Sequence, residues 1–454
     1  MNKVRLVLPL LAVLCLSSCS LVPEENNNNN QNGNSGEQTQ PVDNNPSGGD
    51  QNQSGDNQQG DNTQPVDDDP FKVIPQDSWN IDDTGKIKYV RINSVAAGLN
   101  AATNTAQYNC GGTDLGFPWY DPEEKQLYVT FGDSFDQHKM SGGWNSNVTL
   151  YTKNFDFSNG VKWQGALPGS FGANRQVTPI SQNVASRNGW TASSSDICTP
   201  GTLTTIPTGG IVINGTYYLF YMEVNEFDHI HVNGVRESRI GMWDTFNSRV
   251  VKSTDKGQHW TLTNLVWNCH DTSFNALNGE PFSQIHPLDI GDEYIYIYGI
   301  KGGRESGVSM ARVLKTNFEN INEYEYFCGI KNGEPTYKKG ANGLNYIKGK
   351  SSCLVVNGKC GELSFSYNPY FKSYMMFYLS SQSQIVYRLM GANPYEWGAP
   401  VSIAGQGNIP CLYGGATHEV MFDNKGQRMF MFIAQWSSTL YSTHLVEVVF
   451  NKIR

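Results

Sequence analysis

The sequence predicts an all-β fold, a five-bladed β-propeller that follows a disordered N-terminal tether. The first observation is a unit that recurs five times: an aromatic-rich strand, a polar or glycine-rich loop, and a second strand of alternating residues. The second is that no helical periodicity extends beyond a few turns after residue 70. The copies begin near Leu127, Tyr217, Tyr294, Tyr374 and Met429, and this uneven spacing leaves a two-sheet sandwich as the alternative.

Residues 1–19 have the features of an export signal. Lys3 and Arg5 precede the apolar run Leu6–Leu16, which is too short to span a membrane. The segment that ends at Cys19 resembles the lipobox of bacterial lipoproteins, and the resemblance implies cleavage before Cys19 and a lipid attached to it. An ordinary secretory signal with an incidental cysteine is the alternative. We expect an extracytoplasmic protein, anchored by lipid to the cell membrane or to the outer-membrane surface.

Residues 20–70 read as a flexible linker. They are rich in Asn, Gln, Gly, Asp and Pro and contain no aromatic residue, Lys or Arg, so they cannot bury enough apolar surface to fold. Such a chain spans about 40 Å root-mean-square. It carries ten acidic residues, which leaves the following domain, residues 71–454, with 31 basic against 32 acidic residues. A near-neutral domain lacks the basic surface that binds nucleic acid, so we expect no nucleic-acid partner. We also expect a monomer.

Two local patterns support the propeller. In at least four copies a further strand and a tight turn precede the repeating unit, as at Asn214-Gly215. Residues 253–260, STDKGQHW, match the SxDxGxxW Asp-box of sialidase-like propellers. In that motif the Asp and Gly shape the turn between two outer strands, and the Trp packs between sheets. We therefore interpret Asp255 as structural.

A hairpin near the start of the domain carries the main functional signal. Its turn lies at residues 122–125, and if Asp121 pairs with Gln126, Asp114 falls opposite Asp133. Directly opposed side chains have Cβ atoms roughly 4.5 to 5.5 Å apart. Like charges at that distance are unfavourable unless a proton is shared or the pair does chemistry. The alternative is that Asp114 and Asp133 only shape turns beside glycines.

In a propeller, the loops at one end of the blades gather around the central channel. This geometry would collect Glu223, His286, Arg304, Glu362, His418, Glu419 and Gln435 beside Asp114 and Asp133, with Trp119, Trp144 and Trp436 near the same rim. Carboxylates, an arginine and indoles at one mouth are typical of a carbohydrate site. We predict a glycan partner. Structural roles remain the alternative for the glutamates and Arg304, and are the favoured reading for both histidines.

Several motifs resemble one known family. They are CGGTDLGFPW, FGDSF, GGWNSN, YGIKGGRESGVSMARV and GELSFSYNPYFKSYMMFY, and the similarity runs over nearly all of residues 77–452. The family consists of secreted bacterial propeller proteins once known only as a domain of unknown function. It has endo-D-arabinofuranosidase members that cut the D-arabinan of mycobacterial cell walls. The resemblance implies a five-bladed glycoside hydrolase with Asp114 and Asp133 as the catalytic pair. Asn145 and Asn147 of the GGWNSN motif are predicted to bind the substrate. The motif GDSF replaces the family's usual GDTF and keeps the hydroxyl.

The predicted chemistry is a retaining double displacement, because carboxyl groups about 5 to 5.5 Å apart fit retention and about 6.5 to 9.5 Å fit inversion. The sequence does not decide which Asp is the acid. A non-catalytic glycan-binding or adhesin propeller is the runner-up function. A sialidase is a weaker option, because its arginine triad is not visible.

No cofactor is expected, although a structural calcium ion remains open. No clustered Cys/His spacing suggests a zinc site. Outside Cys15 and Cys19 the chain has seven cysteines, an odd number, so at least one is unpaired within the chain. The spacing of Cys353 and Cys360 does not predict a bridge between them.

Overall fold

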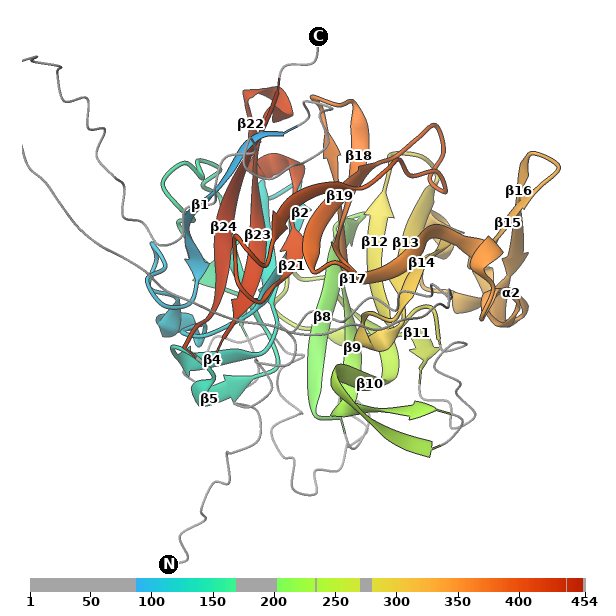
Figure 1. Cartoon of the computed structure of the whole chain (residues 1–454), viewed down its shortest axis with the longest axis horizontal. Helices are drawn as coiled ribbons and strands as arrows, with labels where there is room; N and C mark the ends of the chain where they lie inside the picture. The colour runs from blue at the N-terminus through green and yellow to red at the C-terminus, as the bar shows by residue number, and fades with distance from the viewer. Residues whose placement is uncertain (1–86, 169–201, 233–234, 270–279, 438, 452–454) are drawn as a thin grey trace, which may run out of the picture. The chain divides into compact units, whose positions relative to one another are not determined.

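A computed structural model describes residues 87–168, 202–232, 235–269, 280–437 and 439–451. The predictions for the signal at 1–19, lipidation of Cys19, the linker at 20–70 and the domain start at 71 lie outside these residues. Strands are the main secondary structure of the described residues, which include a single short α-helix, and this confirms the all-β class (Figure 1). None of the helices within these ranges is long and apolar enough to cross a membrane.

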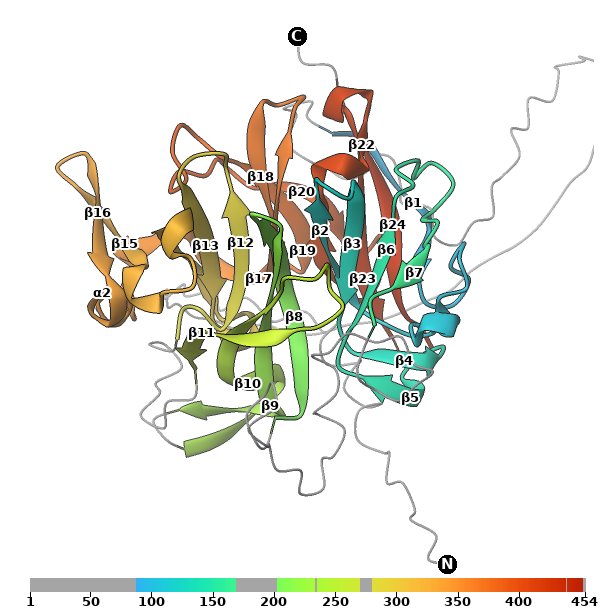
Figure 2. The same ribbon diagram turned by 180° about the vertical axis from the view of Figure 1, so that it is seen from behind.

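Two sheets have four strands each. The first is β2 (Leu115–Asp121), β3 (Gln126–Phe131), β6 (Val148–Thr152) and β7 (Gly165–Ala166), in that order. Figure 2 shows these strands side by side. The second is β8 (Thr204–Ile213), β9 (Thr216–Val232), β10 (Val235–Ser253) and β11 (Thr261–Asn268). A separate two-stranded ribbon pairs β4 (Ser134–Gln137) with β5 (Ser141–Asn145).

A nine-stranded sheet follows in the chain. Its first part is β12 (Gln284–Asp289), β13 (Tyr294–Ile300) and β14 (Ser306–Leu314); β15 (Glu325–Lys331) pairs with β14, and β16 (Glu334–Lys339) pairs with β15. Its second part is β17 (Leu354–Asn368), β18 (Ser373–Ser380), β19 (Gln384–Leu389) and β20 (Val401–Gly405). The two parts are joined by pairing between β14 and β17.

The last sheet brings distant segments together. It consists of β1 (Ile87–Ala97), β24 (Tyr441–Phe450), β23 (Arg428–Trp436), β21 (Leu412–Ala416) and β22 (Phe422–Asp423). Strand β1 pairs antiparallel with β24, from Ile87 opposite Phe450 to Ala97 opposite Thr443. Arg91 and Arg428 both bond the buried carboxylate of Glu447, which fixes β1 on the sheet.

The only α-helix among the described residues is α2 (Gly340–Ile347). Figures 1 and 2 place it with β15 and β16 at the outer edge of the nine-stranded sheet. Short 3-10 turns fill loops: η3 (Thr105–Tyr108), η5 (Gly302–Arg304), η6 (Lys315–Asn317), η7 (Ile321–Glu323), η8 (Ser351–Cys353), η9 (Glu419–Met421) and η10 (Asn424–Gly426).

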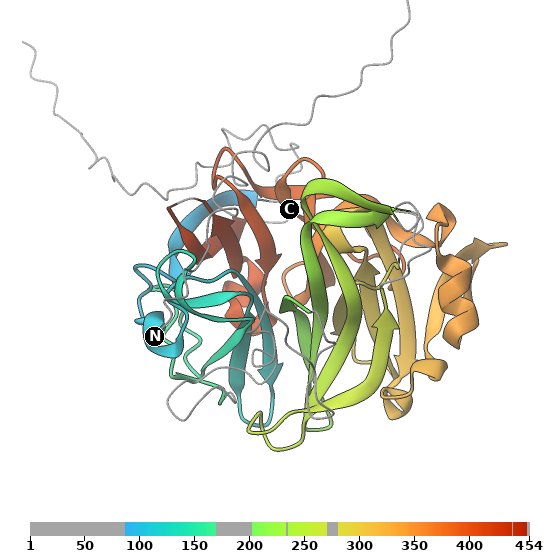
Figure 3. The same ribbon diagram turned by 90° about the horizontal axis from the view of Figure 1, so that it is seen from below.

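The sheets are arranged in a propeller-like manner. The innermost strands contact one another in the closed order β2, β8, β12, β17, β21 and back to β2. In Figure 3, β8–β10 (green) accordingly lie beside β12–β14 (yellow). A two-sheet sandwich has no such closed series of inner strands, so the sandwich alternative is wrong.

All five predicted repeats are antiparallel strand pairs: β3 with β6, β9 with β10, β13 with β14, β18 with β19, and β23 with β24. The predicted turn at Asn214-Gly215 joins β8 to β9, and both residues have positive φ, as this kind of two-residue turn requires. Alternating aromatic and β-branched residues form these strands because both faces of each sheet are covered by neighbouring sheets.

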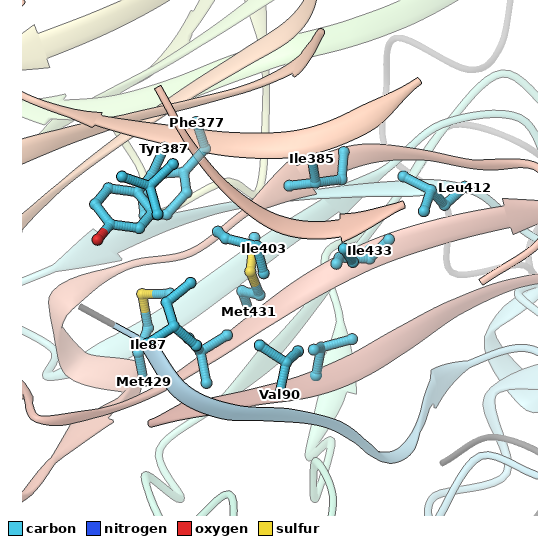
Figure 4. Close-up of a cluster of buried hydrophobic side chains, with 14 of the residues drawn as sticks. Ile87, Val90, Phe377, Ile385, Tyr387, Ile403, Leu412, Met429, Met431 and Ile433 are labelled. Carbon is cyan, nitrogen blue, oxygen red and sulfur yellow. The ribbon is translucent and has the colours of Figure 1, made fainter. Parts of the chain in front are cut away.

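The side chains between sheets form dry apolar clusters. Figure 4 shows one of them, in which Phe377 and Ile385 of the nine-stranded sheet face Met431 and Ile433 of β23. Each of these side chains has no exposed surface. Truncating one of them to Ala would cost about 2 to 5 kcal/mol, so these clusters fix the sheets that carry the loops.

The Asp-box forms the predicted turn between β10 and β11. Asp255 Oδ1 accepts bonds from the Ser253 hydroxyl, at 2.7 Å, and from the His259 amide, at 2.9 Å. The Trp260 side chain is buried against Tyr217 and Leu167. The structural role expected for Asp255 is confirmed.

The structure agrees with the prediction that at least one cysteine is unpaired. Cys110, Cys269, Cys328, Cys353 and Cys360 are all free. Cys353 and Cys360 are therefore not bridged to each other. Cys411 is disulfide-bonded.

Candidate active site

The register of the β2–β3 hairpin differs from the prediction by one residue. Asp121 pairs with Gln126 as expected, but beyond Phe117 the register shifts, and Leu115 pairs with Phe131. Gly116 has a φ of +117°, and this β-bulge adds a residue to β2. As a result the Gly132 amide donates to the Asp114 carbonyl at 3.0 Å. The predicted direct opposition of Asp114 and Asp133 is wrong, because Asp114 lies opposite Gly132.

The two carboxyl groups are nevertheless neighbours. Asp114 lies immediately before β2, and Asp133 lies two residues after the end of β3, at the same end of the hairpin. The charge of Asp133 is one of the causes that raise the pKa of Asp114. Asp114 also packs on Gly132, because a Cβ there would lie 2.2 Å from Asp114 Oδ1.

Asp114 is held in conditions that favour its protonated form. Burial, then the charge of Asp133, raise its pKa to about 7, against bonds from Tyr413 and Tyr441 that lower it. The Tyr413 hydroxyl donates to Asp114 Oδ2 at 2.8 Å, while Asp114 Oδ1 is buried and has no partner among the described residues. A carboxyl group with a pKa near neutrality can donate or accept a proton at physiological pH.

Asp133 has a different, more polar environment. Its Oδ1 accepts a bond from Trp144 Nε1 at 3.1 Å and one from the Thr204 hydroxyl at 2.5 Å. Trp144 comes from β5 and Thr204 opens β8, so two further segments converge on this carboxylate. Two neighbouring carboxyl groups in contrasting environments are what acid/base chemistry requires.

Arg304 and Glu362 form an ion pair at the same end of the strands. Arg304 Nε and Nη2 lie 2.7 and 2.5 Å from Glu362 Oε1. The guanidinium carbon of Arg304 lies 5.1 Å from the ring centre of Trp243 and 5.5 Å from that of Tyr413. The charge of Glu362 also raises the pKa of Asp114, which places this pair beside the two aspartates.

Two other residues that were predicted to lie at this end of the strands are buried within the sheets. Trp119 stacks on Tyr128 with ring centres 4.3 Å apart and is 1% exposed, so its predicted place at the rim is wrong. Glu223 is buried, forms an ion pair with Arg249 at 3.0 Å and accepts a hydrogen bond from the Asn247 amide at 2.8 Å. Neither residue is available to a ligand in this arrangement.

His286 is a structural histidine. It lies in β12 between the rings of Phe117 and Phe365, and its Nδ1 is 2.8 Å from the Thr208 carbonyl. Burial lowers its pKa to about 4, so the ring is neutral at physiological pH.

Asn145 and Asn147 follow Trp144 and are fully buried. Asn147 Nδ2 bonds the carbonyl and the hydroxyl of Thr205, which ties the residue before β6 to β8. Neither amide atom of Asn145 has a partner among the described residues.

His418 and Glu419 lie at the other end of the strands. The His418 ring packs on Tyr120 at 5.6 Å, beside the turn end of β2, whereas Asp114 precedes the opposite end. The cause is the short strand β21: Tyr413 at its start contacts Asp114, and the chain has crossed the sheet by Ala416. The predicted gathering of His418 and Glu419 with the aspartates is therefore wrong. Burial lowers the pKa of His418 to about 4 and raises that of Glu419.

The predicted Trp436 and Gln435 end strand β23. Trp436 Nε1 donates to the sulfur of Met140 at 3.0 Å, which connects it to the β4–β5 ribbon that carries Trp144. Gln435 is buried, and its amide bonds the Pro410 carbonyl and His444. Trp436 thus stays near the rim, and Gln435 is structural.

Sequence reasoning missed Thr204, Trp243, Tyr413 and Tyr441. Tyr413 and Tyr441 lie about 300 positions from Asp114 and have no local signal in the sequence. Across the described ranges, no group of three or more His, Cys, Asp or Glu side chains could hold a metal ion.

Comparisons with known proteins agree with this picture at the level of the fold. The structure is similar to a putative hydrolase from Bacteroides ovatus, with a TM-score of 0.50 and 11% identity over 83% of this chain and 93% of that one. It also resembles a GH43_1 enzyme from Xanthomonas citri, with a TM-score of 0.39 and 13% identity over 78% and 90% of the two chains. A family 117 glycoside hydrolase from Zobellia galactanivorans has a TM-score of 0.40 and 11% identity over 80% and 90%.

A comparison with curated proteins finds no match. The model of one protein family matches residues 100–447, which span the hairpin with both aspartates, Arg304, Glu362 and Tyr441. The chain therefore belongs to the family described as domain of unknown function (DUF4185).

Proposed function

We propose that this protein is a glycoside hydrolase that cuts D-arabinofuranosyl linkages within D-arabinan, the polymer of arabinogalactan and lipoarabinomannan. One observation carries the proposal: two neighbouring carboxyl groups have contrasting environments, and the pKa of one of them, Asp114, is raised to about 7. Glycosidases use such a pair, with one carboxyl group protonated and the other ionised. The substrate class is supported by the resemblance of the CGGTDLG, FGDSF and GGWNSN motifs to those of D-arabinan-cleaving enzymes.

The environment of Asp114 assigns it the role of general acid, and the role given to Asp133 follows the retaining mechanism predicted from the sequence. Asp114, with its raised pKa, is the general acid that protonates the glycosidic oxygen of the leaving group. Asp133, oriented by Trp144 and Thr204, attacks the anomeric carbon and forms a glycosyl ester. Asp114 then takes a proton from water, the water attacks the same carbon, and the ester bond to Asp133 breaks. This double displacement retains the anomeric configuration.

Architecture and location complete the proposal. We interpret the closed series of inner strands as five blades, with the nine-stranded sheet supplying two of them. The sugar chain would run across the end that carries Asp114, with Trp144 and Trp436 as stacking surfaces. The signal and Cys19 would anchor this monomer by lipid outside the cytoplasm, and the linker would let it reach an envelope polysaccharide.

Incubation of the purified protein with D-arabinan tests the function. We expect release of arabino-oligosaccharides, and a loss of at least about a thousandfold in rate for D114N and for D133N. NMR of the first product should show retained anomeric configuration; an inverted product would reject the assigned role of Asp133. Tight binding without products, unchanged in both variants, would favour the glycan-binding or adhesin function instead.

A further inference from the structure

The Arg304–Glu362 pair has a strained backbone on both sides. Arg304 has a φ of +63° and Glu362 a φ of +27°, in the region that residues with a side chain rarely adopt. Such conformations persist only where the surrounding structure enforces them, and they concentrate at functional sites. Glu362 lies where the β17–β18 register shifts, between Gly361 and Ser364.

Glu362 is also an incompletely satisfied buried carboxylate. Arg304 contacts only its Oε1, and the residue is 5% exposed. Its Oε2 is buried without a partner among the described residues. Leaving a charged oxygen in this state is costly.

The pair is connected physically to Asp114. Arg304 lies over the ring of Tyr413, and the Tyr413 hydroxyl donates to Asp114 Oδ2. Trp243 covers Arg304 as a second ring, so the guanidinium cannot swing away freely. The Arg304–Glu362 pair is thus separated from Asp114 by the Tyr413 side chain, and the charge of Glu362 acts on Asp114 across it.

We propose that Glu362, held by Arg304, is a positioning residue whose negative charge adds to burial and to the charge of Asp133 in favouring the protonated form of Asp114. The benefit of this arrangement rests on the proposed function, since a general acid must carry a proton when the substrate binds. The electrostatic effect on Asp114 does not depend on that function and can be measured by itself.

Other groups also act on Asp114 and must be separated from Glu362. The titratable and charged groups around Asp114 are Cys110, Asp133, Arg304, Tyr413 and Tyr441 in addition to Glu362. Replacing Glu362 by Gln leaves all of them in place. It removes one negative charge and leaves the positive charge of Arg304 uncompensated, and both changes favour ionised Asp114.

Carbon-13 NMR of the full chain labelled at the Asp carboxyl carbon provides the test, with D114N used to assign the Asp114 signal. In E362Q we expect the Asp114 midpoint to fall by about one pH unit or more. E362D, which retains the charge, should keep the midpoint within a few tenths of a unit of the wild type. An unchanged midpoint in folded E362Q would overturn the proposal, and so would an equal fall in E362D.

A matched control exists elsewhere in the chain. Arg312 also bonds a glutamate, Glu325, at 2.9 Å and lies between two rings, those of Tyr294 and Tyr337. E325Q removes the same kind of ion pair outside the group of residues that act on Asp114, so it should leave the Asp114 midpoint unchanged. If E325Q shifts the midpoint as much as E362Q, the effect is general and the proposal fails.

Activity gives a second, independent measurement. In E362Q the alkaline limb of the kcat/KM profile on D-arabinan should move to lower pH by the same amount as the NMR midpoint. A shifted midpoint in a protein without any arabinanase activity would reject the proposed function and leave the coupling of Glu362 to Asp114 standing. An unshifted profile in an active E362Q enzyme would reject the positioning role.

Discussion

The hydroxyl of Tyr413 donates a 2.8 Å hydrogen bond to Asp114 Oδ2, across 299 positions of the chain. This bond stabilises the ionised form of Asp114 and so lowers its pKa against burial and the charge of Asp133. Y413F should therefore raise the pKa of Asp114 and move the alkaline limb of the activity profile upward by about one unit. Y387F is the matched control, because the buried Tyr387 hydroxyl has no partner among the described residues. A limb that moves downward in Y413F would contradict the assignment.

The titration of Asp114 should also appear in stability. Its folded-state pKa of about 7 lies above the ordinary value of 3.8 for an aspartate, so the folded protein binds this proton more tightly than the unfolded chain. Stability from this group is present below about pH 4 and is lost as pH rises to about 7, by up to about 1.4 kcal/mol per pH unit. D114N has no titrating carboxyl group at this position, so its free energy of unfolding does not fall in this way. In urea unfolding, the stability of D114N relative to wild type should therefore be greater at pH 8 than at pH 5; an equal difference at both values would exclude the raised pKa.

Gly132 sets the position of Asp114. A Cβ at residue 132 would lie 2.2 Å from Asp114 Oδ1 and 3.1 Å from Leu115 Cδ1, so G132A must displace the carboxyl group. A displacement of about 1 Å can cost on the order of a hundredfold in rate, and we expect kcat to fall by roughly that factor. G407A should have wild-type kcat, because a Cβ at Gly407 meets no atom within 4 Å. Equal activities of the two variants would show that Asp114 need not be held at this position.

Thr204 orients the carboxylate of Asp133 through a hydroxyl bond of 2.5 Å. T204V keeps the side-chain volume and removes this donor, which should lower kcat by about 10- to 100-fold with little change in fold. T336V removes a comparable hydroxyl bond, to the Gly329 carbonyl at 2.8 Å in the β15–β16 hairpin, and should leave kcat unchanged. Kinetics on D-arabinan at a fixed pH compare the two; a full-rate T204V enzyme would show that Asp133 is oriented without Thr204.

Most of the fold was predictable because local sequence patterns determine its strands and turns. Alternating aromatic and branched residues in the segments beginning near Leu127, Tyr217 and Tyr294 form strands wherever both faces are covered. Turn chemistry at Asn214-Gly215 and in the Asp-box needs only neighbouring residues, and both turns form as predicted.

The site was predictable only in part. The prediction that Asp114 lies directly opposite Asp133 was wrong because counting residues across a turn assumes regular strands. The bulge at Gly116 adds one residue to β2. An isolated glycine inside a strand pattern is a sequence signal for such a bulge. The misplacement of His418 arose from the length of β21, which local sequence does not determine. Tyr413 and Trp243 reach the site only through the assembled ring of strands, so no local pattern could identify them.

The pairing of β1 with β24 has a consequence for biosynthesis. About 340 residues separate the end of β1 from the start of β24, so at roughly 5 to 20 residues per second β1 waits about 20 to 70 seconds for its partner to be translated. During that time it is an unpaired strand that could pair with another nascent copy. Lys88 and Arg91, whose side chains stay exposed, place charge along this strand, as natural edge strands do to discourage aggregation. Arg91 would then have two roles. Before β24 has been translated, its charge would disfavour pairing of β1 with other chains, and in the folded protein it forms an ion pair with Glu447.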